Sequence, residues 1–219
     1  MVITYYGISC FKIQSGETVL VFDPPSKDFP ASDFGLKIPR FQTDIVLISH
    51  NQHKDHNGYE TLPGKGDSEY PFIIDGPGDY EIQKVLIKGI KSFHDSELGK
   101  KFGLNTIYVV EIEGINICHM GDFGEKNLTG QIKESLRDID ILFIPILGPS
   151  MDPQMAAQIA AQIEAKIIIP MHYHKDKKAL KKFLDEFGNG ENKPVEKLTL
   201  KKKDIADKKG EAIILIPCL

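Results

Sequence analysis

Cysteine is scarce in this sequence. The three cysteines, Cys10, Cys118 and Cys218, are odd in number and far apart, and no Cys-x-x-Cys occurs. A disulfide framework needs paired cysteines, so the sequence predicts free thiols and a reducing compartment, the cytoplasm. Cys10 and Cys118 lie within apolar runs, where a thiol behaves as a small apolar side chain.

Long apolar runs are also absent. No segment approaches the roughly 20 apolar residues that a helix needs to cross a bilayer. The opening residues alternate polar and apolar side chains with Lys12 among them, which is typical of a strand and not of a signal peptide. We therefore expect no membrane as a partner.

The sequence has no surplus of positive charge. Lysine and arginine number 27 against 31 aspartates and glutamates, for a net charge of −4. This balance gives no general attraction to nucleic acid or to anionic membranes. Lysines do gather late in the chain, but Asp204 and Asp207 lie among them, and we interpret that run as a solvated edge or turn.

The length of 219 residues favours one domain, over residues 1–219. Short β-branched runs predict strands near 2–6, 9–14, 18–22, 45–49, 71–74, 84–90, 106–112, 114–118, 141–145 and 166–170, with a closing strand at 212–216. One helix is predicted after Thr129, with Ile132, Leu136 and Ile139 in it. Two more are predicted over 152–165, with Asp152 as N-cap, and over 176–187, with Gly188 as the stop. This order suits two sheets between helical layers.

The most informative stretch is His50-Asn51-Gln52-His53-Lys54-Asp55-His56. It places three imidazoles and a carboxylate directly after the apolar run Asp44 to Ile48. Imidazole and carboxylate are ligands for zinc, manganese or iron. A strand that ends in such a cluster brings these groups to the rim of a sheet, where α/β folds usually place their sites.

Further groups of the same kind follow later strands. His94 comes after Phe93, Asp122 follows the run that ends at Cys118, and His172 follows Ile167 to Met171. One such histidine is more often a structural residue. Together with the cluster at 50–56, however, these residues form a set of strand-end ligands that has few structural explanations.

The sequence resembles the metallo-β-lactamase superfamily, in particular its small bacterial branch of metal-dependent hydrolases related to the ascorbate-6-phosphate lactonases. The resemblance runs nearly end to end. It rests on Ile3 to Ile13, Asp23-Pro24, Gly76-Pro77-Gly78-Asp79-Tyr80-Glu81, Phe93-His94-Asp95, Gly121-Asp122 and Pro170-Met171-His172-Tyr173 in this order. It implies an α+β fold, the four-layer αββα sandwich of that superfamily.

The resemblance also implies the site residues. One metal site would use His50, His53 and His94, and the other Asp55, His56 and His172, with Asp122 bridging both. Asp55 would also act in catalysis by holding the proton of the attacking water. Asp23 and His119 would orient ligand histidines or be purely structural, and His174 is expected at the surface.

The sequence departs from the family pattern at three places. The family motif is His-x-His-x-Asp-His, whereas this chain has one residue more between His50 and His53. Residues three apart in a strand do not point to the same side, so either a bulge or turn absorbs the extra residue or Asn51 takes the first position. Ile8 stands where the branch commonly has histidine, and Leu147 to Ser150 replaces a Gly-Gly turn.

These features predict a metal-dependent hydrolase with one or two divalent ions, zinc in the first place and manganese or iron as alternatives. A metal-bound hydroxide would attack a small anionic ester, lactone or phosphodiester. The alternatives are a non-catalytic metal-binding or ligand-sensing module on the same scaffold and, among enzymes, a nuclease. A nuclease would need a basic, aromatic groove, which the acidic balance disfavours. The sequence leaves the oligomeric state open.

Overall fold

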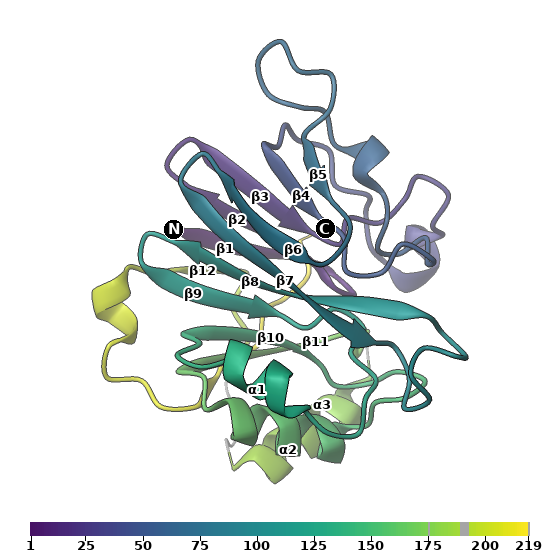
Figure 1. The fold of residues 1–219 in the computed structure, drawn as a ribbon, viewed down its shortest axis with the longest axis vertical. Helices are drawn as coiled ribbons and strands as arrows, with labels where there is room; N and C mark the ends of the chain where they lie inside the picture. Colours follow the sequence, from purple (N-terminus) through teal and green to yellow (C-terminus); the bar gives the residue numbers. More distant parts are fainter. Residues whose placement is uncertain (175, 189–192, 219) are drawn as a thin grey trace.

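The computed structural model describes residues 1–174, 176–188 and 193–218, which form two packed β-sheets with helices on one side (Figure 1). In spatial order, the first sheet contains β12 (Lys197–Thr199), β1 (Val2–Gly7), β2 (Cys10–Ser15), β3 (Thr18–Phe22), β4 (Ile45–Leu47) and β5 (Phe72–Ile74). Its strands from β12 to β3 pair antiparallel, and β3, β4 and β5 pair parallel.

The second sheet repeats this mixture. Its spatial order is β13 (Glu211–Ala212), β11 (Ile167–Met171), β10 (Ile141–Pro145), β9 (Ile115–His119), β8 (Leu104–Ile112), β7 (Val85–Phe93) and β6 (Gly78–Ile82). The strands from β13 to β9 are parallel, and those from β9 to β6 are antiparallel. Because β7 and β9 both run antiparallel to β8, they end at the same edge of the sheet, together with β10 and β11.

The main core lies between the sheets. Alternate side chains of each strand point to this layer, which is why strands such as β1 alternate buried and half-buried residues. Phe11 of β2 stacks on Phe143 of β10 with ring centroids 4.1 Å apart. Central strands such as β10 are buried on both faces and contain only apolar residues.

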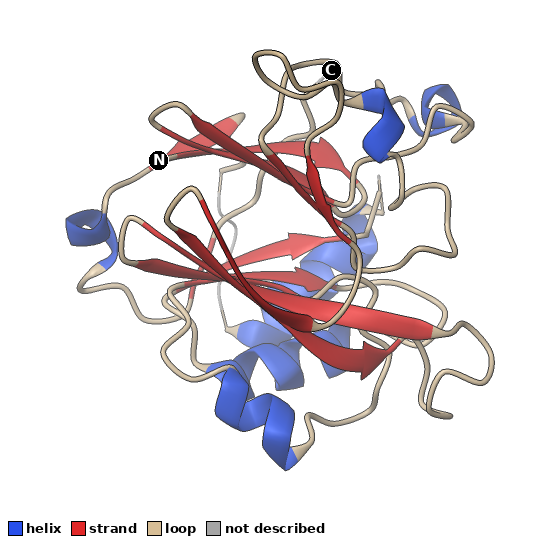
Figure 2. Cartoon of the chain, turned by 45° about the horizontal axis from the view of Figure 1, so that its top comes forward, coloured by secondary structure: helices blue, strands red, loops and turns tan. Residues whose placement is uncertain are grey.

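Three α-helices, α1 (Gly130–Ser135), α2 (Pro153–Ile163) and α3 (Lys177–Phe187), cover the outer face of the second sheet (Figure 2). The caps are those predicted: Thr129 accepts from the N–H of Ile132, Asp152 accepts from Gln154 and Met155, and Gly188 ends α3 in the left-handed conformation. No helix in the described residues has the length and apolar character needed to cross a bilayer.

The predicted α+β sandwich of two sheets is confirmed. Over the first sheet, however, the described residues form loops and the short 3₁₀ helices η1 (Ala31–Phe34) and η2 (Tyr59–Thr61) in place of α-helices. Below them lies a small apolar cluster: Cys10, Val19, Val21, Val46, Ile48 and Leu62. The third 3₁₀ helix, η3 (Lys202–Ile205), follows β12.

Two strands were missed from the sequence, and two element predictions need correction. The edge strands β6 and β12 were not predicted, because Gly78-Asp79 and the lysines around Leu198 mask their alternation. Helix α1 ends at Ser135, before Ile139. The predicted strand at 212–216 is divided: β13 stops at Ala212, and the next residues pair partly with β11 and partly with Val195.

Candidate metal centre

The strand ends named in the sequence meet at one edge of the sandwich. His50 follows β4, His94 follows β7, Asp122 follows β9 and His172 follows β11. Between β4 and η2 the chain does not continue as a strand, because residues 51–56 form turns. The rings of His50 and His53 therefore lie side by side, with centroids 4.4 Å apart, despite the extra residue between them.

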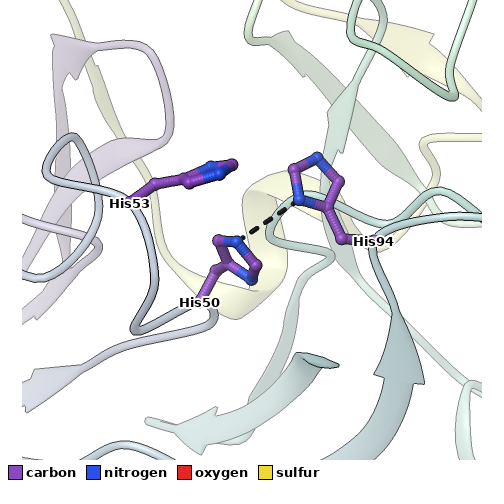
Figure 3. A group of neighbouring side chains, drawn as sticks. All are labelled: His50, His53 and His94. Carbon is purple, nitrogen blue, oxygen red and sulfur yellow. Dashed lines mark hydrogen bonds between the residues drawn. The ribbon is translucent and has the colours of Figure 1, made fainter. Parts of the chain in front are cut away.

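His50, His53 and His94 form what we call the first ligand group. Each offers one nitrogen, and these three atoms lie within 4.8 Å of one another. Figure 3 shows the three rings around a common centre, with Nε2 of His50 3.4 Å from Nδ1 of His94. The Nδ1–H of His50 donates to the Leu104 carbonyl at 2.7 Å, which directs Nε2 into the group.

Asp55, His56 and His172 form the second ligand group, whose ligand atoms also lie within 4.8 Å of one another. Nδ1–H of His172 donates to the Leu147 carbonyl at 2.9 Å, so its Nε2 is free to bind. Nδ1 of the buried His56 lies 3.0 Å from Oδ1 of Asp55, but without hydrogen-bond geometry, and it has no hydrogen-bond partner among the described residues.

Asp122 lies between the two groups and divides its oxygens between them. Oδ1 is 3.2 Å from Nε2 of His56 and 3.3 Å from Nε2 of His172. Oδ2 is 3.5 Å from Nε2 of His94 and 3.9 Å from Nδ1 of His53. A carboxylate so placed has one oxygen available to a cation in each group.

The two groups differ in charge. Burial lowers the pKa of His50 and brings that of His94 to about 4, so these imidazoles stay neutral. Burial alone would also lower the pKa of His56, but the charges of Asp122, Asp55 and Asp23 outweigh it and raise that pKa well above the ordinary value.

Three carboxyl groups thus face one buried imidazole, and the charges of Asp55 and Asp122 alone exceed that of a single imidazolium. Their nearest oxygens lie 3.0 Å (Asp55), 3.2 Å (Asp122) and 3.9 Å (Asp23) from the nitrogens of His56. Like charges this close are unfavourable in a buried site unless a cation compensates them. The donor set of imidazoles and carboxylates, and the orphaned nitrogen of His56, both fit a divalent ion.

Asp23 and His119 lie behind the ligands. Asp23 accepts from the N–H of Ser49 at 2.7 Å and from its hydroxyl at 2.6 Å, and burial raises its pKa to about 7. His119 donates from Nε2 to the Ser9 carbonyl and accepts at Nδ1 from the N–H of Gly121. Since both ring nitrogens are used, His119 holds the surrounding chain and has no nitrogen left for a cation.

Two contacts of the site were missed from the sequence. The hydroxyl of Ser9 lies 3.0 Å from Nε2 of His56, and Asn105 accepts from the backbone N–H of Asp122 at 2.9 Å. The one signal in the sequence for Ser9 is its hydroxyl at the turn between the first two strands. Asn105 lies inside a strand, and nothing in the sequence distinguishes it.

The structure also addresses the family departures. The side chain of Asn51 is exposed and donates to Asp75 at 2.9 Å. Ile8 is buried with φ 56°, a strained conformation for a β-branched residue, and its carbonyl accepts from the N–H of His172 and the hydroxyl of Tyr5. His174 is exposed, as predicted.

The sequence and the fold both match known proteins. The profile of the β-lactamase superfamily domain matches residues 2–172. The chain belongs to the metallo-β-lactamase superfamily. A metal-dependent hydrolase of Anoxybacillus flavithermus is 30% identical over 207 residues, which cover 80% of this chain and 86% of that protein. One of Natranaerobius thermophilus is 26% identical, over 87% of this chain and 94% of the relative.

Solved structures share this fold. A candidate zinc-dependent hydrolase of the metallo-β-lactamase superfamily from Thermotoga maritima is 31% identical, with a TM-score of 0.74 over 98% of this chain and 99% of that one. Human tRNase Z, at 14% identity and a TM-score of 0.53, shares the fold alone. The names of the nearer relatives confirm the predicted class, a metal-dependent hydrolase.

Proposed function

We propose that this metal-dependent hydrolase holds two divalent cations, one in each ligand group, and cleaves a small anionic ester, lactone or phosphodiester. The single observation that carries the proposal is the position of Asp122, with one oxygen toward each group. A divalent ion in such a site lowers the pKa of its water to about 7 and so makes hydroxide available at neutral pH.

The protein's own residues prepare the site. The carbonyls of Leu104 and Leu147 hold His50 and His172 in one tautomer and orientation. Burial would raise the pKa of Asp55, but the neighbouring His56 outweighs it and holds this pKa at about 2, so the carboxylate stays ionised. We assign Asp55 both a ligand oxygen and the acceptor for the proton of the attacking water.

The space beside the ligands supports hydrolysis. A cavity of about 10 Å³ adjoins His94, Asp122 and His172. That is about the room one water molecule needs. His94, Asp122 and His172 give the cavity its polar side, whereas Phe123, Leu147 and Met151 give it apolar walls. The small size of this space fits attack by water on a group that enters from outside, and it favours small substrates.

Mixed imidazole and carboxylate ligands suit zinc, with manganese and iron as alternatives. The first test is the metal content of protein purified without chelator, together with hydrolysis of simple lactones and phosphodiesters. We expect two ions per chain and measurable turnover. His174→Ala is the matched control: this exposed ring lies 5.4 Å from that of His172 but belongs to neither ligand group.

The outcomes separate the proposals. No bound metal after purification without chelator and after zinc addition would overturn the two-ion centre. Two bound ions without turnover of any ester, lactone or phosphodiester would favour the non-catalytic binding module. Turnover confined to nucleic acid would favour the nuclease.

A further inference from the structure

A groove opens beside the metal centre. It has a volume of about 490 Å³, against about 10 Å³ for the cavity at the ligands. It is lined by the loop after His94 (Asp95, Ser96, Glu97, Lys101 and Phe102), by Lys126, by the turn Gly148 to Asp152, and by Met155. The groove has the size of a ligand pocket, which commonly holds about 300–1,000 Å³.

The groove and the metal centre share walls. The turn from Gly148 to Met151 lines both spaces. The Phe102 ring, on the groove side, packs against the His94 imidazole with centroids 5.2 Å apart. When one end of a molecule reaches the metal ligands through this opening, the remainder of the molecule therefore lies in the groove.

The segment after Asp122 fixes the position of Lys126 next to this opening. The N–H of Gly124 donates to the Phe93 carbonyl at 3.0 Å, and a Cβ at Gly124 would come within 2.2 Å of the His94 carbonyl. Glu125 accepts from the N–H of Phe93 at 3.1 Å. The backbone that carries Lys126 is thus held tightly against the strand end that carries His94.

Most charges in the groove have partners in the protein. Asp95 is buried and accepts backbone N–H groups from four residues of its loop, at 2.8–3.0 Å. Glu97 pairs with Lys101 at 2.5 Å, and Asp152 caps α2. Lys126 is exposed and makes no ion pair with any of the described residues.

We propose that Lys126 and the groove form a subsite for the anionic end of the substrate, with the scissile bond at the metal centre. The inference rests on the proposed function and adds a substrate class: an ester or lactone with a carboxylate or phosphate on a short apolar arm. Phe102 and the adaptable thioether of Met155 supply apolar contacts for that arm, and the unpaired ammonium of Lys126 receives the charge.

The test measures binding and does not require turnover. Monohydroxamates of succinic, adipic and suberic acids carry a metal-chelating head and a carboxylate tail, and the corresponding amides have neutral tails of equal length. Titration calorimetry on zinc-loaded protein gives the ratio of the two dissociation constants. We expect the carboxylate tail to bind roughly fivefold more tightly at low salt for at least one length, and less so at high salt.

Three variants locate the preference. Lys126→Ala should remove it and Lys126→Glu should reverse it, while binding of the neutral-tail compounds stays unchanged. Lys100→Ala is the control, because this exposed lysine of the neighbouring loop does not line the groove. A carboxylate preference that survives in Lys126→Ala, or no preference at any tail length, would overturn the subsite. Failure of every hydroxamate to bind the zinc-loaded protein would instead show that the bound zinc has no position open to a ligand, and would overturn the proposed function.

Discussion

The two ligand groups contain the same number of side chains but differ in charge. The first group is made of three imidazoles: His50 and His94 are buried, and the side chain of His53 is 40% exposed. The second contains the carboxylate Asp55, the fully buried His56 and the half-buried His172. The first group can therefore exist without a cation at little cost, whereas the second buries negative charge that a cation would offset.

Asp122 is also placed unequally. Its Oδ1 lies 3.2 and 3.3 Å from the second group, and its Oδ2 lies 3.5 and 3.9 Å from the first. Both differences point the same way. We predict that the second group binds its cation more tightly and that the stability of the fold depends mainly on that cation.

Removal of Asp122 should have the largest effect, because it takes a ligand from both groups at once. We expect Asp122→Ala to lower kcat/KM at least about a thousandfold, or about 4 kcal/mol in the activation barrier. Metal analysis should show loss at both groups. If Asp122→Ala lost only one ion and kept most of its turnover, Asp122 would serve one group and the bridging assignment would be wrong.

The second-largest expected effect is a loss of stability when the metal is removed. A cation that binds only the folded state adds about 2.7 kcal/mol of stability at a hundredfold excess over its dissociation constant. For a chain of this size, chelation should then lower Tm by roughly 5–10 °C. Thermal unfolding monitored by circular dichroism measures this shift. An unchanged Tm after confirmed metal loss would show that the buried carboxylates are compensated in another way.

Single-ligand variants separate the groups directly. His172→Ala should lower the metal affinity of the protein more than His50→Ala, by about tenfold or about 1.4 kcal/mol. The reason is that a cation in the second group is held by the buried charges of Asp55 and Asp122, whereas the first group consists of neutral imidazoles. Equilibrium dialysis against zinc measures both variants, with His174→Ala as control. Equal losses, or a greater loss in His50→Ala, would contradict the ranking.

The sequence predicted the sandwich and the strand-end residues well, because both depend on local patterns. Apolar runs such as Ile141–Pro145 define central strands, and the parallel ends of β9 and β11 bring Asp122 and His172 to one edge whatever the details of packing. The caps Thr129 and Asp152 could be predicted for the same reason, since a cap acts within its own turn.

The contacts that hold the ligands in place could not be predicted, because they join distant parts of the chain. Asn105 accepts a hydrogen bond from the backbone N–H of Asp122. The Ile8 carbonyl accepts one from the N–H of His172, which lies 164 residues further along the chain. No periodicity encodes such pairs. The turn at 51–56 was likewise left open, because strand alternation gives no rule once the strand has ended.

That turn provides the last and smallest test of the comparison, within the first group. The inserted Gln52 packs against the loop that carries His94, since a Cβ at Gly103 would come within 2.1 Å of its Oε1. Gly103 also accepts from the N–H of His94 at 3.1 Å. Deletion of Gln52 restores the family spacing but shortens a turn that already brings His50 beside His53. We therefore expect metal occupancy of the first group and turnover to fall several-fold, which corresponds to about 1 kcal/mol.

Gln52→Ala is the control, because it keeps the turn length and should change both quantities little. Occupancy and turnover that both rise on deletion would mean that the first group is incomplete as it stands, and a deletion without effect on either would remove His50 from the ligand set.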